Sequence, residues 1–162
     1  MTAMDVRFGF GYDVHRLVPE RPLVLGGVGI EYHLGLLGHS DADVLLHSIC
    51  DALLGAAGLG DIGIHFPDTD HRFKGVSSIF LLKEVVQKIS GEGLAVNNID
   101  ATIVAQKPKL APFIPLMREN ISSCVQVDKN RVNIKATTTE GLGFAGQELG
   151  IASYCVCSLV SA

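Results

Sequence analysis

Charge and tryptophan are both scarce in this chain of 162 residues, which has no tryptophan and only 19% charged residues. Soluble domains usually carry about 25% charged residues, so we expect part of the surface to be covered by further copies of the chain. The formal net charge of −4 provides no basic field, which argues against a nucleic-acid partner. A phosphate ligand would have to be held locally, by a metal ion, backbone amides and one or two lysines.

Signals for secretion, membrane insertion and disulfide or redox chemistry are also missing. The four cysteines form no C-x-x-C pair, so we expect buried free thiols in a reducing compartment. The first ten residues lack a signal-peptide pattern. The longest apolar run, at residues 151–160, is too short and too polar to span a membrane. The sequence therefore predicts a cytoplasmic protein with no membrane partner.

The length of the chain predicts one domain over residues 1–162, and strand and helix patterns are intermixed along it. Strands are expected at 6–15, 23–25, 28–32, 99–106, 131–137 and 149–160, the last fully buried, and helices at 41–57, 77–90 and 112–124. Gly26-Gly27 lies between two short strands and predicts a hairpin. The expected fold is an α/β (α+β) sandwich, with a mixed sheet of roughly four strands, a small hairpin, and helices on one face.

A metal site is predicted by three residues from two separate segments. Asp13 and His15 alternate along an expected strand and so share one face, while His47 lies on an expected helix. One carboxylate and two imidazoles form a suitable zinc shell with the fourth position open, and zinc there could polarise a phosphoryl oxygen. The alternative is a core histidine, with His47 bonded along its own helix to Asp43 or Asp51.

Three further stretches could hold phosphate groups. Gly38-His39-Ser40 offers free amides at a helix start, although capping by Ser40 alone is the alternative. Thr137-Thr138-Thr139-Glu140 offers hydroxyls and a carboxylate for a hard ion such as magnesium, or is an ordinary strand end and turn. Ala105 to Ala111 contains Lys109 as a point charge, or is a solvated turn.

The residues from Asp61 to Gly75 are expected to form a long loop, and such a loop is more often functional than idle. No G-x-S-x-G motif, Walker loop or reactive-cysteine pattern occurs in the chain. This absence indicates that any nucleophile is water or part of the substrate.

Taken together, these motifs closely resemble the 2-C-methyl-D-erythritol 2,4-cyclodiphosphate synthase family of the non-mevalonate isoprenoid pathway. The matching stretches are GYDVH at 11–15, GHSD at 38–41, DV at 43–44, GLGDIG at 58–63, FPDTD at 66–70 and KATTTE at 135–140. The resemblance implies a phosphorus–oxygen lyase acting on 4-diphosphocytidyl-2-C-methyl-D-erythritol 2-phosphate. The substrate's 2-phosphate would attack its own β-phosphate, releasing CMP and closing a cyclic diphosphate.

The resemblance also implies a role for each matching position. One zinc ion per active site would be bound by Asp13, His15 and His47, which are called the metal set below. Glu140 would hold a magnesium or manganese ion. His39 and Thr138 would be catalytic, stabilising the transition state. The implied substrate-binding positions are Asp13, His15, His39, Ser40, Asp61, Ile62, Gly63, Phe66, Pro67, Asp68, Thr69, Asp70, Ala105, Gln106, Lys107, Pro108, Lys109, Leu110, Ala111, Thr137, Thr138, Thr139, Glu140 and Phe144.

The implied assembly is a homotrimer with active sites between neighbouring subunits. The family often has Gly-Arg-x-Glu-Gly after Phe144, where this chain has the uncharged Gln147 and the apolar Leu149. These two residues argue against an isoprenoid diphosphate in the threefold cavity. On the residues alone, two other functions stay open: a zinc phosphoesterase that attacks with water, and a non-catalytic metal- or nucleotide-binding oligomer.

Overall fold

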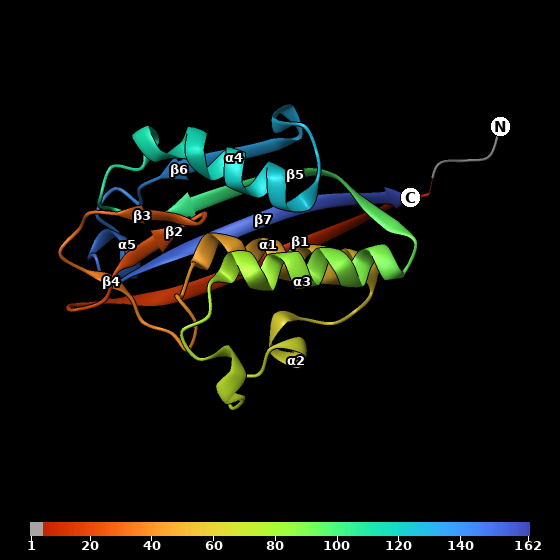
Figure 1. Cartoon of the computed structure of the whole chain (residues 1–162). Helices are drawn as coiled ribbons and strands as arrows, with labels where there is room; N and C mark the ends of the chain where they lie inside the picture. The colour runs from red at the N-terminus through yellow and green to blue at the C-terminus, as the bar shows by residue number, and fades with distance from the viewer. Residues whose placement is uncertain (1–4) are drawn as a thin grey trace.

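Residues 5–162 are described by a computed structural model, in which strands and helices are intermixed around one large sheet (Figure 1). The strands are β1 (Val6–Val18), β2 (Leu23–Leu25), β3 (Val28–Ile30), β4 (Gly35–Leu36), β5 (Leu94–Val104), β6 (Val132–Thr137) and β7 (Gly150–Ser161). The helices are α1 (Val44–Ala57), α2 (Ile62–His65), α3 (Ser78–Gly91), α4 (Ile114–Val125) and α5 (Gly143–Gly146), with 3₁₀ turns at His71–Phe73, Ala111–Phe113 and Lys129–Arg131.

The large sheet has the strand order β4-β1-β7-β5-β6. Strand β6 runs parallel to β5, and the other neighbouring pairs are antiparallel. The predicted mixed α/β class is therefore confirmed, but the sheet has five strands rather than roughly four. The missed strand, β4, pairs only two residues with the end of β1, too few to give a periodic signal. The predicted hairpin forms the separate β2–β3 sheet.

Helices α1, α3 and α4 lie together on one face of the sheet (Figure 1). Helix α1 is the central one and its apolar side chains, including Leu45, Ile49 and Leu53, are fully buried. Its backbone approaches β1 closely because Gly9 and Gly11 face it. A methyl group at Gly9 would overlap the carbonyl oxygen of Ala52, and one at Gly11 would overlap that of Ser48. These two glycines therefore set how near α1 lies to β1.

The opposite face of the sheet exposes a row of apolar side chains along β1 and β7. Six of these side chains are between 40% and 73% exposed: Phe8, Phe10, Tyr12, Val14, Tyr154 and Val156. Side chains alternate between the faces of a strand, so these are the positions that the helices leave uncovered. The prediction that the last strand is fully buried is wrong at Tyr154 and Val156. Exposed apolar patches of this kind are typical of surfaces that contact another molecule.

The start of α1 also differs from the prediction. Asp43, not Ser40, is its N-cap and accepts a hydrogen bond from the Leu46 N–H at 3.1 Å. The same carboxylate accepts from the N–H groups of Gly26 at 3.0 Å and Gly27 at 2.8 Å, which ties the β2–β3 turn to α1. Burial raises the pKa of Asp43 to about 6, although the three N–H donors act in the opposite direction.

The segment from Asp61 to Gly75 is not the continuous loop that was expected. It contains α2 and the 3₁₀ turn at His71–Phe73, each capped by the side chain of the preceding aspartate. One-turn helices are too short for an amphipathic pattern, which explains why the sequence indicated only a loop.

All four cysteines are buried and free, as predicted. In the part of the chain that the structure describes, no helix combines the length and the apolarity that crossing a bilayer requires.

Candidate active site

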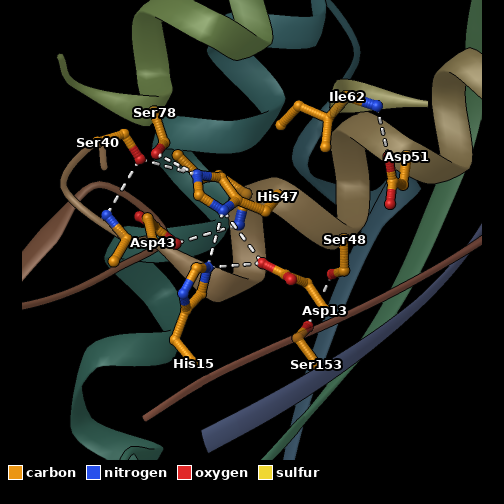
Figure 2. Close-up of polar contacts among 12 residues, drawn as sticks. Asp13, His15, Ser40, Asp43, His47, Ser48, Asp51, Ile62, Ser78 and Ser153 are labelled. Atoms are coloured by element: carbon orange, nitrogen blue, oxygen red, sulfur yellow. Dashed lines mark hydrogen bonds and ion pairs between the residues drawn. The ribbon is translucent and has the colours of Figure 1, made fainter. Parts of the chain in front are cut away.

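The three predicted metal ligands meet at one point above β1 (Figure 2). The Asp13 Oδ2 atom lies 2.9 Å from His15 Nε2 and 3.0 Å from His47 Nδ1, and the two ring nitrogens are 3.1 Å apart. Zinc bonds of about 2.0–2.1 Å in a tetrahedral shell place ligand atoms about 3.3 Å apart. The three atoms need to separate by only a few tenths of an ångström, so the group is a potential metal site.

Each histidine presents one particular nitrogen because its other nitrogen is already bonded. His15 Nδ1 lies 2.9 Å from the carbonyl oxygen of Leu37, to which it donates. His47 Nε2 lies 2.9 Å from Ser78 Oγ and 3.1 Å from Ser40 Oγ. These contacts leave His15 Nε2 and His47 Nδ1 as the nitrogens that face Asp13. Metal-binding histidines are oriented by hydrogen bonds of this kind on the nitrogen that does not bind the metal.

The alternative in which His47 is bonded to Asp43 or Asp51 along its own helix is wrong. The Asp51 carboxylate accepts from the Ile62 N–H at 2.8 Å, which fixes the start of α2. The Asp43 carboxylate is occupied by backbone N–H groups of the hairpin turn and of α1. The His47 ring therefore finds its partners on other elements, β1, α3 and the segment before α1.

The metal set is electrostatically suited to a cation. Burial alone would raise the pKa of Asp13, but hydrogen bonds from His15 and His47 outweigh it and bring this pKa well below its ordinary value. Burial would lower the pKa of His15, but the hydrogen bond and the charge of Asp13 prevail and raise it. The Asp13 carboxylate is therefore ionised near neutral pH and carries the negative charge that attracts a cation.

A cavity of about 240 Å³ opens beside the metal set. It brings five of the predicted substrate-binding residues, His39, Ser40, Ile62, Phe66 and Asp68, next to the metal ligands. The complete lining is His15, Gly38, His39, Ser40, His47, Ile62, Phe66, Asp68, Phe73 and Leu81. A larger cavity of about 560 Å³ lies between α3 and α4, and no predicted site residue lines it.

Several predicted residues of the 61–70 segment support this cavity without lining it. Asp61 accepts from the Ile64 N–H at 3.0 Å and so caps α2. The Asp70 carbonyl accepts from His39 Nε2 at 3.1 Å, while its carboxylate forms an ion pair with Arg72 at 2.6 Å. The remaining predicted residues of this segment, Gly63, Pro67 and Thr69, are also outside the lining.

Sequence reasoning missed two residues that line the cavity, Phe73 and Leu81. Phe73 packs its ring edge-on against Phe66 at a centroid distance of 5.2 Å. Leu81 lies on α3, where it follows the ordinary apolar pattern of a core helix. Neither residue type distinguishes a cavity wall from core packing, so the sequence contained no signal for them.

A second cavity, of about 350 Å³, brings together the other predicted stretches. It is lined by Ala105, Gln106, Lys107, Pro108, Lys109, Leu110, Ala111, Ala136, Thr137 and Thr138. The Gln106 side-chain oxygen accepts from the Gly141 N–H at 3.2 Å, which links the two stretches. The lining ends at Thr138, and it does not include the predicted residues that follow in the chain, Thr139, Glu140 and Phe144.

Three strand spacings separate β1, which carries Asp13 and His15, from β6, whose last residues line the second cavity. In the sheet Val14 pairs with Ala152, Ala152 with Val104, and Val104 with Thr137. At about 4.8 Å per strand, this row spans about 14 Å. Paired residues share a face of the sheet, so Thr137 points to the same face as Val14, whereas Asp13 points to the helices. One chain therefore does not bring its Thr137 side chain to its own metal set.

The fold and the site together define a class of protein. It is a mixed α/β protein with a potential metal site of three protein ligands, which would leave the fourth position of a tetrahedral shell open. An open position is typical of catalytic rather than structural zinc sites.

Comparison with known families narrows this class. The model of the YgbB family matches residues 6–160, and the chain belongs to this family. A relative from Lachnospira eligens, 2-C-methyl-D-erythritol 2,4-cyclodiphosphate synthase, is 64% identical over 156 residues, which cover 96% of this chain and 85% of the relative. The family resemblance predicted from the sequence is thus confirmed.

Solved structures agree with the sequence comparison. The bifunctional IspDF of Campylobacter jejuni superposes with a TM-score of 0.95 at 46% identity, covering 99% of this chain. The present chain spans only 43% of that longer protein. The IspF–CDP complex of Plasmodium falciparum superposes with a TM-score of 0.85 at 33% identity, covering 96% of each chain.

Proposed function

We propose that this chain converts 4-diphosphocytidyl-2-C-methyl-D-erythritol 2-phosphate to 2-C-methyl-D-erythritol 2,4-cyclodiphosphate, with release of CMP, in isoprenoid precursor biosynthesis. The observation that carries the proposal is the metal set of Asp13, His15 and His47, beside a cavity lined by the motif residues His39 and Ser40. Membership of the YgbB family and the name of the 64% identical relative support the same reaction.

The proposed metal is one zinc ion per active site, held by the Asp13 carboxylate, His15 Nε2 and His47 Nδ1. When bound, zinc would supply positive charge to a phosphoryl oxygen at the open coordination position. Glu140 is the proposed ligand of a second, hard divalent ion, magnesium or manganese, which prefers carboxylate and phosphate oxygens.

The hydroxyl of Ser40 is arranged to bind a phosphate oxygen. Its Oγ atom accepts from the Ala42 N–H at 3.2 Å and lies 3.1 Å from His47 Nε2. With a proton on Nε2, the Ser40 hydroxyl proton is left free to point into the cavity and donate to the substrate. His39 borders the same cavity, where its imidazole could stabilise negative charge that develops on the transferring group.

The proposed reaction needs no nucleophile from the protein because the substrate's 2-phosphate attacks its own β-phosphate. The protein's task is to hold the two phosphates in line and to offset their repulsion. Correct positioning can lower a barrier by about 7–11 kcal/mol in well-oriented cases. The apolar side chains of Ile62, Phe66 and Phe73 line the cavity, where they would limit the access of water that could otherwise give a linear product.

We propose a homotrimer in which the second cavity of one subunit faces the metal set of the next. Ala105–Ala111 and Thr137 would bind the cytidine diphosphate part, and Thr138 would act on the transferring phosphate. Two observations support this arrangement: the row of exposed apolar side chains on the outer face, and the placement of Thr137 on the face opposite Asp13. The CDP bound to the Plasmodium relative supports a cytidine nucleotide as ligand.

The rest of the proposal follows from the same family. Residues 1–162 would form one cyclodiphosphate-synthase domain, acting in the cytoplasm, where four free buried thiols would persist. The uncharged Gln147 and the exposed apolar Leu149 are the reason to expect no anion in a threefold cavity.

The test is a phosphorus-31 NMR assay of the purified, zinc-loaded protein with the proposed substrate. We expect CMP and a cyclic diphosphate, and no oxygen-18 incorporated from labelled water. A linear product that contains solvent oxygen would indicate a phosphoesterase instead. Substrate binding without turnover would indicate a non-catalytic binding protein.

A further inference from the structure

Two side chains outside the proposed metal ligands and substrate contacts, Asp41 and Ser78, complete the surroundings of the His47 ring. Ser78 is the first residue of α3 and is fully buried. Figure 2 shows its hydroxyl next to the His47 ring, on the side of the ring away from Asp13. Asp41 lies in the segment before α1, and its N–H donates to the Val76 carbonyl at 3.1 Å.

The hydrogen bonds of Ser78 have only one consistent direction. The Ser78 N–H donates to Asp41 Oδ2 at 3.1 Å, and the Ser78 hydroxyl donates to Asp41 Oδ1 in a short hydrogen bond. An ionised carboxylate only accepts hydrogen bonds, so the hydroxyl proton is committed to Asp41. Toward His47 the Ser78 oxygen can then only accept, and the proton between them must sit on His47 Nε2, 2.9 Å away.

Ser40 also lies near His47 Nε2, but it cannot impose this choice. The partners of the Ser40 hydroxyl are the Ala42 N–H and His47 Nε2, neither of which is a carboxylate that would hold its proton. That hydroxyl could therefore donate to a bare Nε2 as readily as it accepts from a protonated one. Of the two serines at Nε2, only Ser78 discriminates between the tautomers of His47.

We infer that Asp41 and Ser78 are positioning residues, which hold His47 as the Nε2–H tautomer and so direct the Nδ1 lone pair at the metal. The inference rests on the proposed function only in taking this set as the zinc site. Partners of this kind around a metal-binding histidine typically change metal affinity by about 10–100-fold when they are lost.

The test is a zinc titration of the metal-free protein in competition with a chromophoric chelator. Ser78→Ala removes the acceptor, and Asp41→Asn releases the Ser78 proton to donate toward Nε2. We expect each change to weaken zinc binding by about tenfold or more. Nitrogen-15 NMR of the metal-free protein, recorded where the imidazoles are neutral, should show His47 protonated at Nε2 in the wild type and a larger share protonated at Nδ1 in Ser78→Ala. A merely structural role of Ser78 would not produce this difference.

Ser77→Ala is the matched control. Ser77 is the exposed N-cap of the same helix, and its hydroxyl accepts from the Ile79 N–H at 3.3 Å without contacting His47. Its loss should lower the unfolding midpoint and leave zinc affinity unchanged. If Ser78→Ala does not fold, Asp41→Asn and the wild-type NMR spectrum decide the question.

Three results would overturn the inference: wild-type zinc affinity in Ser78→Ala and Asp41→Asn, an equal loss in Ser77→Ala, or His47 protonated at Nδ1 in the wild type. A wild type without zinc affinity would overturn both the proposed zinc site and this inference. A wild type that binds zinc but forms no cyclic diphosphate would contradict only the proposed reaction, because the titration uses no substrate.

Discussion

The metal set and the segment from Thr137 to Phe144 are built in opposite ways. Asp13, His15 and His47 come from two elements, and each is held by partners from other parts of the chain. The Thr137 to Phe144 segment is largely exposed and makes mainly local contacts, such as the hydrogen bond from Thr139 Oγ1 to the Leu142 carbonyl at 2.6 Å. The first region is organised within one chain, whereas the second has its polar groups turned outward.

The difference shows where preorganisation comes from in the proposed site. A metal set must be rigid before the metal arrives, because a loose set loses affinity when it is ordered. The exposed threonines and Glu140 need no such frame of their own if a neighbouring subunit supplies it. Four predictions test this contrast, from the largest expected effect to the smallest.

Removing an imidazole from the metal set should have the largest effect. In His47→Ala two protein ligands remain, so we expect loss of bound zinc and a fall in kcat/KM on the order of 10³-fold or more. Metal analysis and the NMR assay measure both. His65→Ala is the control, since His65 Nε2 bonds to the Leu59 carbonyl at 2.8 Å, away from the metal set. Stoichiometric zinc in His47→Ala would place the metal elsewhere.

Mixing two defective variants should restore activity if the two regions meet between chains. His47→Ala removes a ligand from the metal set only, and Glu140→Gln removes a carboxylate from the exposed segment only. In a randomly mixed ring of three, roughly one site in four combines two intact regions, so activity should recover to roughly a quarter of the wild type. The activity is measured after the two proteins are unfolded and refolded together. A mixture no better than either variant alone would place both regions in one chain.

Lifting α1 from β1 should weaken the metal set while leaving the exposed segment unchanged. In Gly11→Ala the new methyl group would press on the Ser48 carbonyl, and such overpacking costs about 1–3 kcal/mol of folding free energy. Urea unfolding measures the loss, and zinc affinity should fall with it. Gly29→Ala is the control, because a methyl group there meets no atom within 4 Å. Equal stability of the two variants would contradict the close approach.

Both a fall and a rise in pH should slightly lower the folding stability of the metal-free protein, through Asp13 and His15 of the metal set. The pKa of Asp13 is lowered on folding, so its contribution is present above about pH 4 and is lost as the pH falls. The pKa of His15 is raised, so its contribution is present below about pH 6.5 and is lost as the pH rises through the folded-state value. The free energy of unfolding, measured by thermal unfolding, should be roughly 1–2 kcal/mol higher between these limits than outside them.

Asp13→Asn should flatten that maximum, because it removes the charge on which both shifts depend. A wild-type profile with the same shape as that of Asp13→Asn would contradict the assignment of these shifts to the Asp13–His15 contact.

The sequence predicted the metal set because simple periods connect its members. The two-residue spacing put Asp13 and His15 on one side of β1, and a helical pattern placed His47 over them. The contact between Asp41 and Ser78 had no such pattern, since 37 residues separate the two. The start of α1 was mispredicted because Ser40 and Asp43 are both good caps, and the hairpin turn that selects Asp43 is a tertiary contact.

The exposure of side chains on the outer face of the sheet was equally hard to predict. Tyr154 and Val156 are typical of a buried strand, and nothing local tells a face covered by helices from a face left open. The elements β4 and α2 are too short to show a period. The sequence thus predicted which residues meet in the metal set more reliably than it predicted which surfaces are exposed.

The placement of Thr137 and Asp13 on opposite faces of one sheet restricts how copies of the chain can assemble. A twofold dimer joins two copies through the same patch on each. Regions on opposite faces of the sheet cannot both belong to that patch, so a twofold dimer could not bring them together. If the two regions meet between chains, as proposed, the contact is head-to-tail, and a head-to-tail series leaves one unmatched region at each end unless it closes on itself. The number of complete sites would then depend on closure of the ring. Loss of a single subunit would leave one metal set and one Thr137 segment without a partner.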